Sequence, residues 1–133
     1  GVAMSEDAVL AAARTAQGRA HAPYSRYRVG AAVAAEDGRI FAGCNVENAS
    51  YGLTICAERG AVMAAVAGGA TRLRRVVVVT DSEPPAAPCG ACRQFLAEFG
   101  LGLEVEAVGP SSTRRWQLSE LLPASFDKGF LER

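Results

Sequence analysis

Three cysteine residues have the side chains and the spacing to hold a metal ion. Cys89 and Cys92 are three positions apart, so both sulfur atoms can face one point across the first turn of a helix, and Cys56 stands at a second predicted helix start. Helix N-termini carry a partial positive charge that favours thiolate over thiol. In catalytic sites zinc takes three protein ligands and keeps a fourth position open for water. The pattern predicts one catalytic Zn²⁺ per subunit, held by these three cysteines.

Glu58 follows Cys56 at the same helix start, from where its carboxylate can reach the open coordination position. A carboxylate beside a metal-bound water can accept its proton and later deliver it to a ring nitrogen or a leaving amine. The alternative is a first-turn glutamate that only stabilises the helix dipole. We interpret Glu58 as the catalytic proton carrier.

A cation is expected beside the metal ligands. Three thiolates on Zn²⁺ give a net charge of −1, and a neighbouring guanidinium bonded to a thiolate would offset it. Arg59 and Arg93 each adjoin a ligand segment, and either one is otherwise an ordinary surface arginine. We favour Arg59.

The four cysteines allow other interpretations than a catalytic zinc site. Cys44 or His21 would have to complete a closed structural zinc site, but we expect Cys44 to be a buried free thiol and His21 to lie in a loop. Two disulfides are typical of short secreted chains, and a Cys-x-x-Cys redox motif needs neither a third cysteine nor Glu58. A zinc-binding domain without catalysis remains a rival, in which Glu58 has no chemical role.

Composition and charge favour a small substrate over a polymer. The 133 residues suffice for one domain (1–133), in which residues 1–3 precede Met4 and are interpreted as an expression remnant. Lys+Arg and Asp+Glu both number 14, whereas a nucleic-acid-binding domain gathers its cations into a patch. No apolar run approaches the roughly 20 residues that cross a bilayer, and no signal-peptide pattern is present. We expect a cytoplasmic protein without nucleic-acid or membrane partners.

The elements that position these residues follow from the hydrophobic pattern. Helix-start residues, glycines that end apolar runs and four consecutive valines mark helices and strands in turn. In chain order we expect a helix over 5–19, strands over 27–35 and 40–45 joined at Asp37-Gly38, a helix over 56–67, a strand over 76–79, a helix over 90–99, strands over 104–108 and 114–118, and a helical turn over 119–122. Strand and helix alternate after an antiparallel N-terminal hairpin. This order predicts an α/β fold in three α-β-α layers around a mixed five-stranded sheet.

Both ligand segments, and four further runs, are typical of a known family. The ligand segments read Cys56-Ala57-Glu58 and Pro88-Cys89-Gly90-Ala91-Cys92-Arg93-Gln94, and the other runs cover 22–25, 29–32, 43–48 and 121–123. From about Ala22 to Phe126 the chain resembles the small homotetrameric cytidine deaminases. The resemblance implies their fold, a homotetramer with shared active sites, and zinc-dependent hydrolysis of cytidine and 2′-deoxycytidine to uridine, 2′-deoxyuridine and ammonia in pyrimidine salvage. Related zinc deaminases use the same water activation with a glutamate that is not a ligand.

The resemblance also assigns roles outside the metal site. It implies that Asn45 and Glu47 bind the ribose 3′-hydroxyl and that the backbone of Ala57 meets the base edge. Tyr27 stands where the family often carries a Phe packed against the base, and Phe126 resembles the aromatic residue that reaches into a neighbouring subunit's site. Without the resemblance, Asn45 and Glu47 would be a polar strand end, and Phe126 would belong to C-terminal core packing.

The motifs narrow the substrate class. The resemblance associates His-Ala-Glu with polynucleotide and larger-subunit deaminases, whereas Cys56-Ala57-Glu58 with an upstream Asn-x-Glu fits free nucleosides. Blasticidin-type antibiotic deaminases share the cysteine motifs, but the run over 45–48 is similar to the cytidine type. The resemblance therefore favours a free pyrimidine nucleoside.

Overall fold

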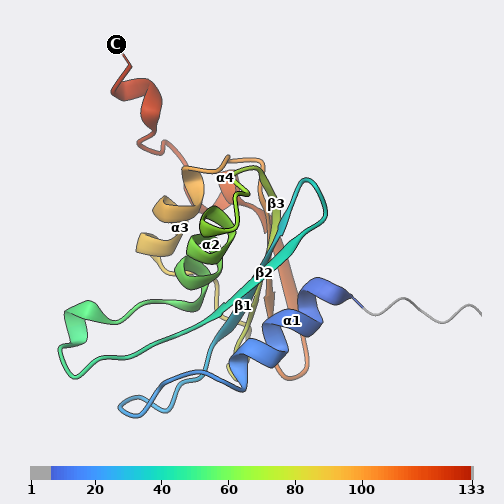
Figure 1. Ribbon diagram of the computed structural model, residues 1–133, viewed down its shortest axis with the longest axis vertical. Coiled ribbons are helices and arrows are strands. Elements are labelled where there is room, and N and C mark those ends of the chain that lie inside the picture. The colour runs from blue at the N-terminus through green and yellow to red at the C-terminus, as the bar shows by residue number, and fades with distance from the viewer. Residues whose placement is uncertain (1–6, 133) are drawn as a thin grey trace, which may run out of the picture.

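A single five-stranded sheet with helices on both faces organises the chain (Figure 1). The computed structural model describes residues 7–132. Its elements are α1 (Ala8–Gln17), β1 (Gly30–Ala35), β2 (Ile40–Cys44), the 3-10 helix η1 (Tyr51–Leu53), α2 (Ala57–Ala67), β3 (Leu73–Val79), α3 (Gly90–Ala97), β4 (Glu104–Val108), β5 (Thr113–Gln117), α4 (Leu118–Leu121) and the 3-10 helix η2 (Lys128–Phe130). The strands lie in the order β2-β1-β3-β4-β5, with β3 parallel to β4 and every other neighbouring pair antiparallel. The predicted three-layer fold with a mixed sheet is confirmed.

Helix α1 begins behind a side-chain cap. Asp7 Oδ1 accepts hydrogen bonds from the backbone N–H groups of Val9 and Leu10, each at 3.1 Å, which is how an N-cap aspartate satisfies the free donors of a first turn. The first two positions of the helix expected over 5–19 lie outside the described residues, as do residues 1–3. The helix ends at Gln17, two residues before the expected end at position 19.

The N-terminal hairpin turns where the sequence predicts, but its first strand is shorter. Gly38 takes a φ of +93° in the turn, a conformation that favours glycine. Strand β1 begins at Gly30 rather than at Tyr27. The Asn45 side chain binds the preceding segment instead, since its Oδ1 accepts from Val29 N at 2.9 Å and its Nδ2 donates to Tyr27 O at 2.7 Å. One backbone bond, from Asn45 N to Val29 O at 3.2 Å, continues the pairing, and the Asn45 side chain holds the rest of this segment.

The four valines of β3 are buried on both faces of the sheet, as predicted. Val76 and Val78 point into the core layer that α2 and α3 cover, and Val77 and Val79 point into the layer that α1 covers. Alternate residues of a strand face opposite sides, so one short run supplies both hydrophobic layers. Because β3 lies at the centre of the sheet, Thr80 and the loop after it start from a fixed point.

Two glycines let helices approach the sheet more closely than a side chain would allow. A Cβ on Gly30 would collide with the backbone of α1 at Ala13 and Gln17, and a Cβ on Gly43 would collide with the backbone of α2 at Ala57 and Ala61. The contact at Gly43 fixes the first turn of α2 against β2.

The remaining helices begin close to their predicted starts. The helix expected over 56–67 begins at Ala57, because Cys56 is its N-cap, and the helix over 90–99 ends at Ala97, shortly before Gly100 with its φ of +119°. The 3-10 helices η1 and η2 were not predicted. The segment that carries η2 projects away from the body of the molecule (Figure 1). Within residues 7–132, no helix combines the length and the hydropathy needed to span a bilayer.

Candidate active site and metal centre

Two helix starts bring the three predicted ligands together. Cys56 is the N-cap of α2, Cys89 is the N-cap of α3, and Cys92 lies in the first turn of α3. Their Sγ atoms all lie within 4.8 Å of one another. A tetrahedral zinc ion with Zn–S bonds of about 2.3 Å separates its sulfur ligands by about 3.8 Å. The three residues therefore fit one zinc ion with little movement.

Two of the thiols differ in how readily they ionise. The pKa of Cys56 is lowered to about 5, first because the Cys92 thiol donates a hydrogen bond to the Cys56 thiolate and then because the Arg59 guanidinium lies beside it. The pKa of Cys92 is raised, because it keeps the proton that it shares with Cys56 and because it is buried. One proton must leave this pair when a metal binds.

Arg59 is the cation beside the cluster. Its Nη2 donates to Cys56 Sγ at 3.6 Å, and its pKa is raised, chiefly by this bond. Arg93 has another role, since its Nε donates to Pro88 O at 2.7 Å and its Nη1 to Leu121 O at 3.0 Å. Of the two arginines considered, Arg59 thus contacts a thiolate and Arg93 ties the loop before α3 to α4.

Glu58 is a buried carboxyl in the first turn of α2. Only 5% of its surface is exposed, and it lines the same cavity as Cys56 and Cys89. Burial raises its pKa, and the charge of the Cys56 thiolate adds to the effect. A raised pKa makes a carboxyl group a better proton acceptor and keeps more of it in the protonated, proton-donating form.

Cys56 and Cys89 line a cavity of about 320 Å³, which is within the range of small-molecule sites. Its lining includes Glu58 and four of the five predicted substrate residues, namely Tyr27, Asn45, Glu47 and Ala57. A hollow of about 570 Å³ lies between α3 and the C-terminal segment, but its lining includes none of the cysteines or Glu58. Of these two cavities, the smaller one is therefore the candidate active site, because Cys56, Cys89 and Glu58 line it.

The predicted ribose residues are held by hydrogen bonds to the neighbouring loop. Asn45 is 8% exposed and binds the backbone on either side of Arg28, as described above. Glu47 Oε1 accepts from the backbone N–H groups of Tyr24 and Ser25, and Ser25 Oγ donates to Oε2. The Ser25 hydroxyl is the first cause of the lowered pKa of Glu47. Glu47 is therefore a fixed, charged acceptor at the cavity.

Tyr27 and Phe126 are both exposed. Tyr27 is 37% exposed, and its hydroxyl donates to Ser82 Oγ at 3.4 Å. Phe126 is 56% exposed, stacks on Phe130 with ring centroids 5.4 Å apart, and lines the larger hollow instead of the cavity. The alternative that Phe126 packs in the core of its own chain is therefore wrong.

The fourth cysteine and the histidine stay outside the cluster. Cys44 is a free thiol, as predicted, but it is only partly buried, and its Sγ donates to Arg19 O at 3.7 Å. His21 pairs with Val46 in an isolated bridge. Among the described residues the sulfur cluster has three members, and all four cysteines are free of disulfides.

Sequence reasoning missed part of the cavity wall. Thr80, which is 4% exposed, lines the cavity together with Ala86 and Ala87. One signal was available, because Thr80 directly follows a buried strand, and strand ends are where binding residues gather in α/β folds. Nothing in the local sequence marked the alanines.

A three-layer α/β fold that presents three cysteine ligands and a buried glutamate at two adjoining helix starts defines the class of zinc-dependent deaminases. The sequence profile of the cytidine and deoxycytidylate deaminase zinc-binding region matches residues 4–105. The cytidine deaminase of Sporosarcina psychrophila is 42% identical over 127 residues, which cover 94% of this chain and 93% of that protein. The chain therefore belongs to the cytidine deaminase family.

Other relatives agree with this assignment. The cytidine deaminase of Mycobacterium tuberculosis is 46% identical over 114 residues, which cover 86% of this chain and 84% of that protein. A crystal structure of cytidine deaminase from Burkholderia pseudomallei matches the fold with a TM-score of 0.87 and 45% identity, covering 92% of this chain and 100% of that one.

Proposed function

We propose that this enzyme hydrolyses cytidine and 2′-deoxycytidine to uridine and 2′-deoxyuridine, releasing ammonia, with one Zn²⁺ bound by Cys56, Cys89 and Cys92. The observation that carries the proposal is the buried Glu58 carboxyl beside a three-sulfur cluster in a cavity of about 320 Å³. When bound, zinc supplies a Lewis acid that lowers the pKa of a coordinated water to roughly 7. Glu58 supplies the proton transfers, and the residues of the cavity wall bind the nucleoside.

Glu58 carries the protons of the reaction. The hydrolysis consumes one water and releases one ammonia, so a proton must move from the attacking water to N3 of the base and another to the departing amine. Glu58 takes the first proton and delivers it to N3, and then serves the leaving group. Its raised pKa suits this double role, because burial favours the protonated form, which is the form that acts as an acid.

Arg59 keeps Cys56 ionised. The guanidinium at 3.6 Å from Cys56 Sγ favours the thiolate, which is the form that binds metal. It also offsets part of the negative charge that three thiolates bring to the site.

Asn45, Glu47, Ala57 and Tyr27 bind the nucleoside in this proposal. An Asn side chain has four hydrogen-bonding positions, and Asn45 uses one donor and one acceptor on the backbone, which leaves one of each for a ribose hydroxyl. Glu47 accepts three bonds and retains a further acceptor position. Ala57 is fully buried in the cavity wall, where its backbone meets the base edge, and Tyr27 covers the base.

We also infer a cytoplasmic homotetramer in which Phe126 completes a neighbouring subunit's site. Large apolar side chains of α2 and α3 are exposed, namely Met63, Val66 and Phe95, and so is Phe126. Exposed apolar side chains of this size favour an interface where they form one patch. The free thiols suit a reducing compartment.

The direct test is the loss of absorbance as purified enzyme converts cytidine to uridine, with and without a chelator. We expect turnover of cytidine and deoxycytidine that the chelator abolishes and added zinc restores. Product formation from blasticidin S and from guanine is measured in parallel, because rival zinc deaminases act on such other bases. No turnover of the two nucleosides would contradict the proposal.

The matched variant is Glu58→Gln, which preserves the shape of the side chain and removes its ability to carry a proton. We expect kcat to fall by about 10³-fold or more, with zinc content unchanged. Glu36→Gln is the control, because Glu36 is exposed in the β1–β2 turn at the opposite end of the sheet from Thr80. Full activity of Glu58→Gln would favour a zinc-binding domain without catalysis.

A further inference from the structure

The loop between β3 and α3 forms one wall of the cavity without regular secondary structure. It runs from Thr80 to Cys89, and Thr80, Ala86 and Ala87 line the cavity. An irregular segment has few backbone hydrogen bonds of its own to fix it. A loop that carries both a cavity wall and a metal ligand therefore depends on contacts with other parts of the molecule.

One carboxylate of this loop is docked into the turn between β4 and β5. Glu83 Oε1 accepts from the backbone N–H groups of Ser111 at 2.8 Å and Ser112 at 3.2 Å, and Ser112 Oγ donates to Oε2 at 2.7 Å. Bonds to a charged acceptor are stronger than neutral ones. The Ser111 N–H is the first cause of the lowered pKa of Glu83, so the carboxylate stays ionised in its place.

Gly109 makes room for this docking from the side of the turn. A Cβ at Gly109 would collide with Glu83 Oε1 and with the main-chain oxygen of Ser82. Only glycine therefore allows the loop to approach the turn this closely. The loop and the turn are complementary in both shape and hydrogen bonding.

The segment between Glu83 and Cys89 is stiff, so the position of the docked carboxylate constrains the position of Cys89. Three of the five intervening residues are prolines, and each proline fixes its own φ near −65°. Two of them, Pro85 and Pro88, are fully buried, and Arg93 Nε holds Pro88 O at 2.7 Å. A stiff segment fixed at both ends leaves little freedom to the alanines and to Cys89.

We propose that Glu83 is a positioning residue for the active site: by anchoring the loop to the β4–β5 turn it holds the cavity wall and Cys89 in place. This inference rests on the proposed function, because the wall has a role only if a nucleoside binds against it. The competing explanation is that Glu83 only stabilises the β4–β5 turn. The two explanations differ in what the loss of the carboxylate does to substrate and metal binding.

The test is Glu83→Ala in the full-length zinc enzyme, with cytidine kinetics and with zinc transfer to a chromophoric chelator. We expect KM for cytidine to rise by about threefold to tenfold while kcat stays within about twofold, because a disordered wall weakens binding of substrate and transition state alike. We also expect zinc transfer at a lower chelator concentration, because Cys89 is less preorganised. Glu83→Gln, which keeps Oε1 as an acceptor, should recover part of both effects.

Two further variants probe the other side of the contact. Ser112→Ala removes one bond and should move KM and zinc transfer in the same direction, less strongly. Added to Glu83→Ala it should change nothing more, because the shared interaction is already lost. Gly109→Ala should reproduce the Glu83→Ala phenotype with the carboxylate still present. These variants decide the matter if Glu83→Ala does not fold.

The control is Glu36→Ala, an exposed glutamate at the far end of the sheet, which should leave KM and zinc transfer unchanged. Wild-type KM and wild-type zinc transfer in Glu83→Ala, with only a lower melting temperature, would overturn the inference. Should the wild-type enzyme fail to deaminate cytidine, the proposed function fails. The zinc-transfer measurement would still report separately on the anchor.

Discussion

Among the proposed metal ligands, Cys56 is ionised with the help of a second cysteine and of an arginine. Cys92 is the larger influence on the Cys56 thiolate and Arg59 is the second, so the cluster is partly prepared for a cation before any metal arrives. A zinc site with three sulfur ligands needs such compensation, because each added thiolate weakens the pull of the metal on a bound water.

Replacing Arg59 by glutamine is expected to raise the pKa of Cys56. The wild-type pKa lies near 5, so the thiolate is present above that pH, and an upward shift confines metal binding to higher pH. At pH 6 we expect zinc affinity to fall by about tenfold, with a smaller loss at pH 8. Competitive zinc titrations across this range measure the effect.

The matched control for this experiment is Arg14→Gln. Arg14 is exposed on α1, which packs on the face of the sheet opposite to α2 and α3. It should bind zinc like the wild type at every pH. Equal behaviour of the two variants would show that Arg59 does not act on the ligands.

The clustering of the three cysteines and the place of Glu58 beside them could be predicted from the sequence because each motif is local. Cys56 and Glu58 share one helix start, and Cys89 and Cys92 share another, so spacing alone relates them. Glu83 carries no such signal, since its three donors lie in a turn 28 or 29 residues away. Its position follows only from how β4 and β5 meet the loop.

At the scale of elements, the packing of α2 on β2 sets where Cys56 and Glu58 lie. We expect Gly43→Ala to destabilise the fold by about 1–3 kcal/mol, because the new methyl group meets backbone atoms of Ala57 and Ala61 that have no room to move. The first turn of α2 should shift, and zinc should be bound less tightly. Chemical denaturation and zinc content measure both effects.

Gly102→Ala is the comparison for this variant. A Cβ at Gly102 would meet no atom within 4 Å, and the residue lies between α3 and β4. We expect its free energy of unfolding to stay within about 0.5 kcal/mol of the wild type. A Gly43→Ala enzyme as stable as Gly102→Ala would contradict the close packing of α2.

The elements themselves were largely predictable, and their ends were not. Four valines in a row identified the central strand, and Asp37-Gly38 identified the hairpin turn, because both signals are local. The start of β1 was misplaced, because the Asn45 side chain binds Tyr27 O and Val29 N from another part of the chain. Tertiary hydrogen bonds thus overrode a run of residues with strand propensity.

At the scale of the whole molecule, a shared active site makes a distinct prediction for mixed subunits. Phe126→Ala and Glu58→Gln should each lower the deaminase activity of the proposed homotetramer. In a random equal mixture about a quarter of the sites would combine an intact Glu58 with an intact Phe126 from a neighbour. Recovery of about that fraction of wild-type activity is expected, measured on co-expressed subunits separated by tag.

If Phe126 acted only within its own chain, the mixture would show no recovery. Doubling the enzyme concentration serves as the control for dissociation. The exposure of Phe126 in the single chain is consistent with a neighbour covering it, while its shared role stays a prediction.

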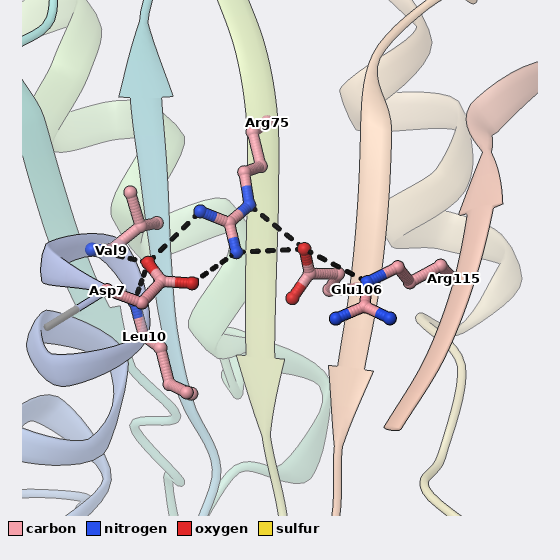
Figure 2. A network of polar contacts seen from close by, with 6 residues as sticks. All are labelled: Asp7, Val9, Leu10, Arg75, Glu106 and Arg115. Atoms are coloured by element: carbon pink, nitrogen blue, oxygen red, sulfur yellow. Dashed lines mark hydrogen bonds and ion pairs between the residues drawn. The ribbon is translucent and has the colours of Figure 1, made fainter. Parts of the chain in front are cut away.

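A charge network ties α1 to the sheet across three strands (Figure 2). Arg75 on β3 donates to Asp7 Oδ1 at 3.0 Å and to Asp7 Oδ2 at 2.6 Å, and its Nη2 also donates to Glu106 Oε1 at 2.8 Å. Arg115 on β5 lies 3.5 Å from the same Glu106 oxygen. Glu106 is only 9% exposed, so it depends on both arginines for compensation.

The network should make the free energy of unfolding fall at acid pH, and one substitution tests this. Arg75 is the first cause of the lowered pKa of Asp7, which lies at about 2 instead of 3.8. A carboxyl with a depressed folded-state pKa stabilises the fold above about pH 4, and this contribution is lost as the pH falls toward 2.

Asp7→Asn keeps an N-cap acceptor and removes the charge. We expect a loss of about 1 kcal/mol at pH 6, after allowing for partial exposure, and only a small remainder of it at pH 2, where the folded-state carboxyl is half protonated. Asp37→Asn, in an exposed pair with Arg39, should show a smaller effect that salt abolishes. A constant difference between Asp7→Asn and the wild type from pH 6 to pH 2 would mean that the cap, and not the charge, holds α1.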